Sequence, residues 1–139
     1  MAHNDSLPKP AAELLERIER EFQGVPRPRI TKHVARGLDD EWFLSDERGA
    51  ELAKLDPEHD WHEVSDEDVQ KFNEYFSFSD EEGWRFYLPA YMSYYLRNYS
   101  DRYMNPVQLA YRFSPERLAL LTPAQKRCVE EFVALSETE

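Results

Sequence analysis

A chain of 139 residues, 14% of them aromatic, has the size of one domain and enough large side chains to close a single hydrophobic core. Its formal net charge of −11 argues against a general nucleic-acid-binding protein, because neutralising phosphates requires a basic surface, and it suits a protein with a basic partner. The single cysteine excludes an internal disulfide and a cysteine-rich zinc site.

The first helix is indicated by apolar residues at helical spacing over residues 11–22. Residues 1–9 are expected to form a flexible tail, and residues 10–136 are expected to form one helical domain. Gly24 ends the helix, and two prolines exclude helix from the connector over residues 25–29.

The next part of the chain is expected to be irregular. Thr31 is placed to cap a short helix that ends near Leu38. The adjacent apolar residues 42–44 follow no helical period and are expected to tuck into the core. Two helical turns over residues 47–55 should end before Pro57.

Charge is distributed unevenly along the chain. Residues 39–82 contain 17 acidic and three basic side chains, whereas the remainder carries a small positive excess. The overall charge argues against nucleic-acid contact through the basic cluster that precedes this acidic segment. That cluster consists of Arg27, Arg29, Lys32 and Arg36. Such asymmetry is commonly solvated surface, and the acidic segment would attract a basic protein.

Ser65 is a stronger local signal. It is expected to cap a helix that begins at Asp66, because three consecutive acidic residues in the first turn suit the positive end of the helix dipole. Val64 and Val69 occupy the two positions of a hydrophobic staple around this cap.

Residues 84–99 form the densest aromatic run in the chain. Proline is favoured at the first helical position, so Pro89 predicts a central helix over about residues 88–99. An alternative is a longer helix from Asp80, capped by Ser79 and kinked at Pro89. The break is preferred because a proline inside a helix costs about 3 kcal/mol.

Three capping residues, each followed by proline, divide the C-terminal part of the chain. They are Asn105, Ser114 and Thr122. Gln125 completes a capping box with Thr122, and the helix that follows should end near Ser136. Residues 107–113 are the only segment compatible with a strand. The pattern predicts an all-α domain, compact and irregular, around the central helix.

Tyrosine and arginine side chains in the central run form one candidate binding site, which consists of Tyr87, Tyr91, Tyr94 and Arg97. These residue types are enriched at interface hot spots, so a groove lined by them would bind a partner. The alternative is a core helix, because aromatic stripes usually serve packing.

A second candidate site lies at His59, His62 and Glu63. Two histidines three residues apart can face one way on a helix, and a nearby carboxylate could complete a divalent-metal site. The spacing differs from the HExxH arrangement, and the position after Pro57 is also typical of an acidic loop. Cys128 lies on the apolar face of the last helix, where a buried thiol behaves as a small hydrophobe.

The segments Phe86–Tyr91 (FYLPAY) and Leu121–Gln125 (LTPAQ) resemble a small uncharacterised bacterial domain family with an FYLPAYL-like segment and an LTxxQ helix start. Met92 replaces a leucine of that pattern, which conserves volume. The resemblance covers roughly residues 72–135. It implies a bacterial cytoplasmic domain of unknown function and brings no catalytic residues.

No catalytic motif is recognisable, so we expect a non-enzymatic, acidic interaction module that uses no cofactor and binds a basic partner, as an antitoxin-like or immunity-like protein would. A metal-binding protein or metal-dependent hydrolase that uses His59 and His62 is the alternative. A cytoplasmic location is expected, because the N-terminus lacks a signal pattern and no run approaches the roughly 20 apolar residues that span a bilayer.

Overall fold

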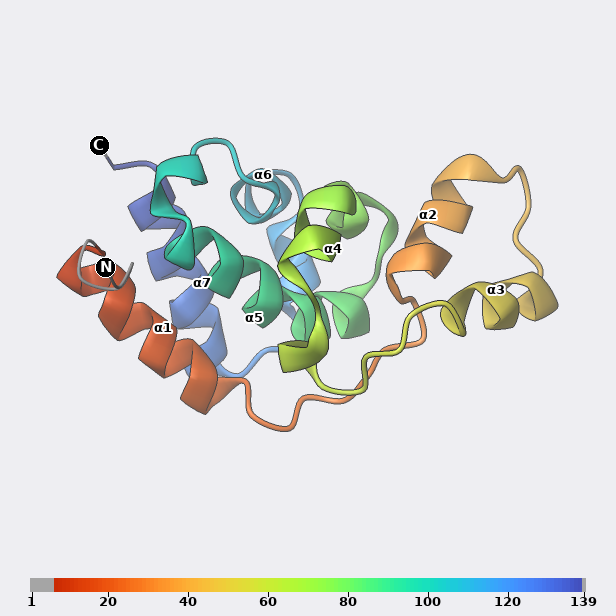
Figure 1. Ribbon diagram of the computed structural model, residues 1–139, viewed down its shortest axis with the longest axis horizontal. Helices are drawn as coiled ribbons and strands as arrows, with labels where there is room; N and C mark the ends of the chain where they lie inside the picture. The colour runs from red at the N-terminus through yellow and green to blue at the C-terminus, as the bar shows by residue number, and fades with distance from the viewer. Residues whose placement is uncertain (1–6, 139) are drawn as a thin grey trace.

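Seven α-helices linked by short 3-10 turns make up the fold, seen in a computed structural model that describes residues 7–138. No strand occurs within that range, and the prediction of an all-α fold is confirmed. Residues 1–6, most of the predicted tail, lie outside the described residues. Figure 1 shows a larger bundle that contains the first and the last helix and a smaller projection formed by two helices.

Three long helices build the bundle. α1 (Lys9–Glu21) and α7 (Pro123–Ser136) pack against each other and against α5 (Glu81–Arg97), which runs through the centre (Figure 1). The predicted apolar face of the first helix is confirmed, because Ala11, Leu14, Ile18 and Phe22 are fully buried and Leu15 packs half-buried against them. Gly24 follows α1 with a φ of +74°, a left-handed conformation that glycine adopts without a steric penalty.

The central helix is continuous, so the predicted start at Pro89 is wrong. α5 begins at Glu81, and the Asp80 side chain caps it by accepting a hydrogen bond from the Gly83 N–H at 2.9 Å. The alternative of a longer helix is confirmed, with Asp80 rather than Ser79 as its cap. The interior proline removes a backbone hydrogen bond at a cost of about 3 kcal/mol. Burial of most side chains of α5 offsets that cost.

The projection, which we call the α2–α3 lobe, consists of α2 (Lys32–Asp40) and α3 (Asp46–Ala53). Both helices lie close to their predicted positions. Thr31 precedes α2, but its buried hydroxyl makes no capping bond, so that predicted interaction is wrong.

The link between α2 and α3 holds Trp42 and Phe43. Both were expected in the core, and both are instead exposed to water. Leu44 of the same link and Leu52 of α3 both lie against Gly37 of α2, where a side chain larger than hydrogen would collide with Leu52, so Leu44 takes the inward position. The link therefore turns its aromatic side chains outward.

Three predicted caps are confirmed. Side-chain oxygens of Ser65, Asn105 and Thr122 each accept a hydrogen bond from the backbone N–H three residues further on. They begin α4 (Asp66–Lys71), α6 (Pro106–Phe113) and α7, respectively. The possible strand over residues 107–113 is therefore helical.

Ser114 makes no capping bond, and only a 3-10 turn follows it, whereas Gln125 completes the predicted capping box of α7. The 3-10 turns are η2 (Trp61–Glu63), η3 (Tyr75–Phe78), η4 (Tyr99–Asp101) and η5 (Pro115–Leu118). Within residues 7–138, no helix is both long enough and apolar enough to cross a membrane.

Candidate functional site

The three tyrosines of the predicted groove lie in the interior. The Tyr87 hydroxyl donates to Glu58 Oε2 at 2.7 Å, and the Tyr91 hydroxyl donates to the Phe72 carbonyl oxygen at 2.6 Å. The Tyr94 hydroxyl accepts a hydrogen bond from the side-chain amide of Gln70. Burial raises the pKa of Tyr87 and of Tyr91, so both hydroxyls stay protonated. These rings build the core and present no groove to a partner.

Arg97, the fourth residue of the predicted groove, lies on the surface at the end of α5. Its guanidinium forms a two-pronged ion pair with the Asp66 carboxylate at 3.0 and 2.9 Å. The hydrogen bond from Arg97 lowers the pKa of Asp66. The pair links the start of α4 to the end of α5, and the structure does not bring Arg97 together with the buried tyrosines at a common surface.

Of the predicted metal ligands, His62 and Glu63 belong to the 3-10 turn η2 and His59 lies just before it. Glu63 Oε1 accepts the backbone N–H groups of His59 and Asp60 at 2.8 and 2.9 Å. Both ring nitrogens of His62 contact carboxylates, one of Asp60 and one of Glu19. Across residues 7–138, no group of three or more histidine, cysteine or acidic side chains is arranged to hold a metal ion. The histidines therefore do not converge on a shared ligand set.

A cluster of charged side chains that local sequence patterns do not reveal joins the α2–α3 lobe to the bundle. The Lys32 ammonium is fully buried and lies 2.6 Å from Asp68, 3.0 Å from Glu58 and 3.6 Å from Asp56. Burial disfavours the charged ammonium, but the hydrogen bond to Asp68 and the charge of Glu58 outweigh it and raise the pKa of Lys32. His33 completes the cluster, with its backbone N–H and Nδ1 both on the Asp56 carboxylate.

Arg27 reinforces this junction from the connector that precedes α2. Its guanidinium donates to the carbonyl oxygens of Ala53, Asp56 and Glu58 at 2.9, 2.8 and 2.5 Å. Arg36 pairs with Glu74 of the bundle at 2.8 Å. Three members of the basic cluster seen in the sequence, Arg27, Lys32 and Arg36, are thus paired with acceptors of the same chain and do not form an open basic surface.

The buried ion cluster has a structural role. The side chains of Lys32, Asp56 and Glu58 are at most 1% exposed, so a substrate has no access to them. Cys128 is also buried, as expected, and burial raises the pKa of its thiol, which disfavours the reactive thiolate.

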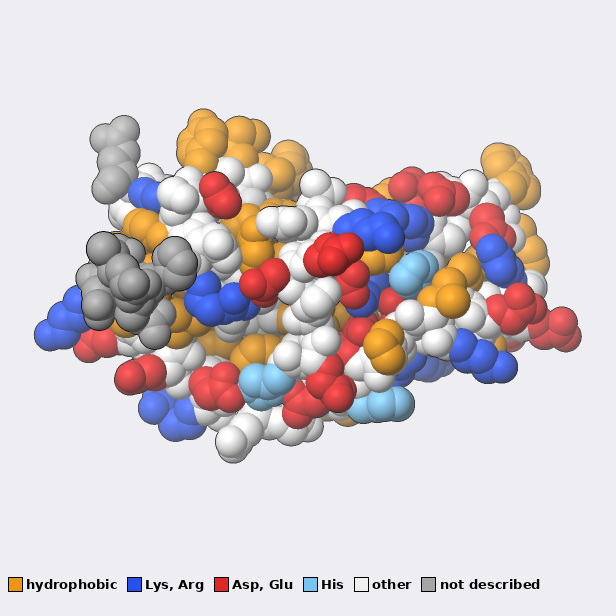
Figure 2. All heavy atoms as spheres, viewed as in Figure 1, with side chains coloured by type: hydrophobic (Ala, Val, Ile, Leu, Met, Phe, Trp, Pro, Cys, Tyr) orange, Lys and Arg blue, Asp and Glu red, His pale blue; other side chains and the backbone are white. Residues whose placement is uncertain are grey.

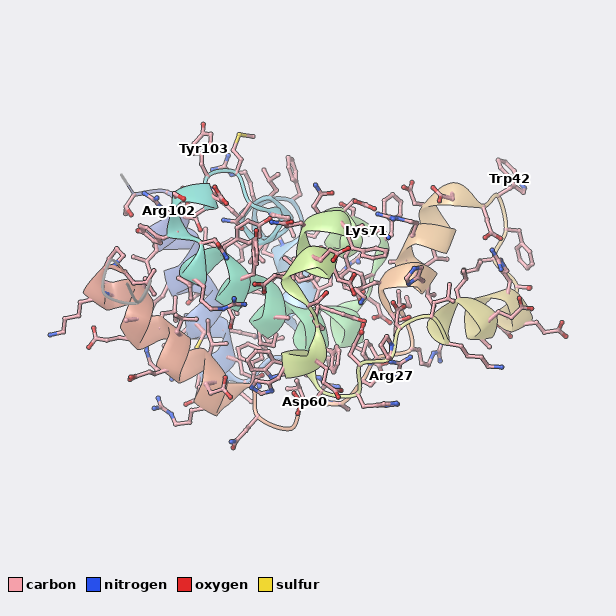
Figure 3. The ribbon with its side chains drawn as sticks, viewed as in Figure 1. Arg27, Trp42, Asp60, Lys71, Arg102 and Tyr103 are labelled. Carbon is pink, nitrogen blue, oxygen red and sulfur yellow. The ribbon has the colours of Figure 1, made fainter. Side chains whose placement is uncertain are left out.

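The surface feature best suited to recognition is the tip of the α2–α3 lobe. Trp42 is fully exposed and Phe43 is 76% exposed. Figure 3 shows Trp42 at the far end of the molecule, pointing away from the bundle. Five acidic side chains lie within four residues of this pair, namely Asp39, Asp40, Glu41, Asp46 and Glu47.

The same end of the molecule shows apolar side chains beside acidic ones in Figure 2. Arg48, a base in this stretch, is already hydrogen-bonded to Glu41 at 3.2 Å. Exposed aromatic rings beside carboxylates can take up basic groups of another protein. Sequence reasoning placed Trp42 and Phe43 in the core, although the acidic runs on both sides were the available signal of an exposed link.

The model of a family of unknown function (DUF6714) matches residues 10–139. Comparison with curated proteins and with solved structures finds no match. The predicted resemblance to an uncharacterised family is thereby confirmed, while its bacterial origin and its two sequence motifs stay predictions.

Proposed function

We propose that this chain, which belongs to the family of unknown function DUF6714, binds a protein with a basic surface through the tip of its α2–α3 lobe. The observation that carries the proposal is the exposure of Trp42 and Phe43 among acidic side chains. An aromatic ring buries about 150–250 Å² when it is enclosed. The pair therefore supplies the apolar centre that interface hot spots require.

The charges around the tip define the partner. The carboxylates of Asp39, Asp40 and Glu41 precede the aromatic pair, and those of Asp46 and Glu47 follow it. A lysine or arginine of a partner would pair with these carboxylates and stack on Trp42. Complementary charge of this kind speeds association and makes it sensitive to salt. An antitoxin-like or immunity-like protein that covers a basic partner is one form of this function.

Affinity capture from the source cell at low and moderate salt tests the proposal. We expect the wild-type chain to retain a stoichiometric partner with a basic surface, and to retain less of it as salt rises. The double variant Trp42→Ala/Phe43→Ala should weaken binding about 30-fold or more, because hot-spot residues contribute at least about 2 kcal/mol.

Leu120→Ala is the matched control, since Leu120 is another exposed apolar residue and lies outside the lobe. The variants should keep the helical circular dichroism of the wild type, because the removed side chains are exposed. The proposal is refuted if the double variant retains the partner as the wild type does, or if the wild type retains no stoichiometric partner.

A further inference from the structure

A second surface feature is a groove bounded by α5, α6 and the segment between them, which we call the α5–α6 groove. It encloses about 510 Å³. Tyr95 of α5 and Leu109 of α6 line its sides, and Tyr103, Met104 and Phe113 stand at its rim. A volume of this size lies within the range of small-molecule sites, about 300–1,000 Å³.

The rim residues leave a large apolar area exposed to water. Tyr103 and Phe113 are 78% and 76% exposed, and Met104 is 54% exposed. Figure 2 shows the corresponding apolar patch along the upper edge of the bundle, and Figure 3 shows Tyr103 projecting from that edge. Contiguous exposed apolar surface on a monomer marks a binding site more often than a chance arrangement does.

The backbone conformation of Met104 at the rim of the groove is strained. Met104 has a φ of 54°, a left-handed conformation that residues other than glycine rarely adopt and that costs about 1–3 kcal/mol. The neighbouring Asn105 caps α6 and also bonds to the Arg102 carbonyl oxygen at 2.6 Å, which fixes the turn. The strained turn holds Met104 at the groove.

The charged side chains that line the groove are both acidic, Glu74 and Asp101. Glu74 is shared with Arg36 at 2.8 Å, whereas Asp101 makes no ion pair among residues 7–138. Arg102, next to Asp101 in sequence, does not line the groove; it donates to the Leu135 carbonyl oxygen of α7 at 3.2 Å and stacks over the Tyr99 ring at 4.0 Å. Asp101 is therefore the uncompensated negative charge of the groove.

The field of this carboxylate reaches the groove wall. Burial, the neighbouring Tyr94 and the negative charge of Asp101 together raise the pKa of Tyr95. The Tyr95 hydroxyl stays protonated, and its ring offers an electron-rich face. Aromatic faces and a carboxylate together favour a cation, and the cation gains most where apolar walls exclude water.

We propose that the α5–α6 groove binds a small organic cation with an aromatic or aliphatic body, whose charged group faces Asp101 and whose body lies between Tyr103 and Phe113. The acidic lining disfavours a second copy of this chain as the occupant, because the chain itself carries a net charge of −11. This site is independent of the lobe tip, since neither Trp42 nor Phe43 lines the groove.

Titration with three matched probes tests the proposal: protonated 2-phenylethylamine, neutral 2-phenylethanol and anionic 3-phenylpropionate. The probes share one aromatic body and differ in charge. Binding is followed by backbone amide chemical shifts. We expect a dissociation constant on the order of 1 mM for the amine, shifts centred on Tyr95, Asp101 and Phe113, and about fivefold or more weaker binding of the other two probes.

Two groove variants and one control separate the contributions. Asp101→Asn should bring the amine to about the affinity of the alcohol, and Phe113→Ala should weaken all three probes about threefold or more. Both side chains are exposed, so neither change threatens folding. Leu120→Ala, an exposed apolar residue outside the groove, should leave all three affinities unchanged.

Equal affinities of the three probes, or shifts centred elsewhere on the protein, would overturn the assignment. An amine preference that survives Asp101→Asn would also overturn it, as would the absence of binding to the wild type at probe concentrations of about 10 mM. Loss of partner capture by the lobe variants has no bearing on this titration, so the two proposals fail separately.

Discussion

Replacing Lys32 by methionine tests whether the buried ion cluster holds the α2–α3 lobe to the bundle. Methionine keeps most of the side-chain volume but leaves Glu58 and Asp56, 3.0 and 3.6 Å from the lost ammonium, buried without a counter-charge. Asp68 is one-third exposed and can turn to water. Removing one partner of a buried ion pair costs about 3–5 kcal/mol, a large part of the stability of one domain.

Urea unfolding followed by circular dichroism measures this loss. The deficit of Lys32→Met should be full at pH 7, because Glu58 and Asp56 then lack the ammonium that faces them in the wild type. In the wild type the pKa of Lys32 is raised above its ordinary 10.5. Its contribution is therefore complete below that ordinary value and is lost as the pH rises through the raised one.

Lys54, exposed on the same lobe, gives the control, and Lys54→Met should change the unfolding free energy by less than about 0.5 kcal/mol. The reasoning fails if Lys32→Met matches the wild type at pH 7.

Four further outcomes are expected. Gly83→Ala should lower the free energy of unfolding by about 1–3 kcal/mol, because the new Cβ would overlap Ser79 and Tyr75. Gly49→Ala should raise the free energy of unfolding by up to about 1 kcal/mol, because no atom lies nearer than 3.9 Å to the new Cβ. Equal effects of the two variants in urea unfolding would contradict this reasoning. In NMR titration the pKa of His62 should lie above 6.5: burial is the largest single effect and lowers it, but the hydrogen bonds to Asp60 and Glu19 together outweigh burial. The resulting stabilisation is below about 1 kcal/mol at this exposed site. It is present below pH 6.5 and is lost as the pH rises through the raised pKa. Burial raises the pKa of Tyr75, Tyr87 and Tyr91. Alkaline titration followed at 295 nm should therefore show these three hydroxyls ionising only when the protein unfolds, above about pH 10. Gradual ionisation in the folded state would argue against their burial. Trp42 is exposed while Trp61 and Trp84 are buried, so Trp42 should account for most of the quenching by ionic quenchers. The ratio of the caesium to the iodide quenching constant should exceed the ratio for a free tryptophan analogue, and a lower ratio would mean that acidic side chains do not surround Trp42.

The features that sequence reasoning recovered are local ones. Ser65, Asn105 and Thr122 each act on a backbone N–H three residues away, so the residues that decide each cap are adjacent in the sequence. The same holds for the apolar face of the first helix, which depends on a repeat within 12 residues. These interactions need no knowledge of the rest of the fold.

The features it missed depend on distant parts of the chain. The cost of Pro89 was judged locally, whereas the helix is maintained by burial of aromatic residues on both sides of the proline. In the sequence Lys32 belongs to a basic cluster, but its carboxylate partners lie 24 to 36 residues further along the chain. The adjacent apolar residues Trp42 and Phe43 suggest a buried segment, but the sequence around them does not reveal whether the core has room for their side chains.

The position of Lys32 at the first residue of α2 has a mechanical consequence for Trp42 at the other end. The nine residues of α2 span about 14 Å, and three carboxylates hold Lys32 in its first turn, at the base. The link that carries Trp42 is therefore attached to the far end of a short, anchored helix. A partner that binds the ring therefore meets a helix that is already ordered, and association loses little backbone entropy in α2. Loosening the base should therefore weaken recognition at the tip without altering any residue that touches the partner.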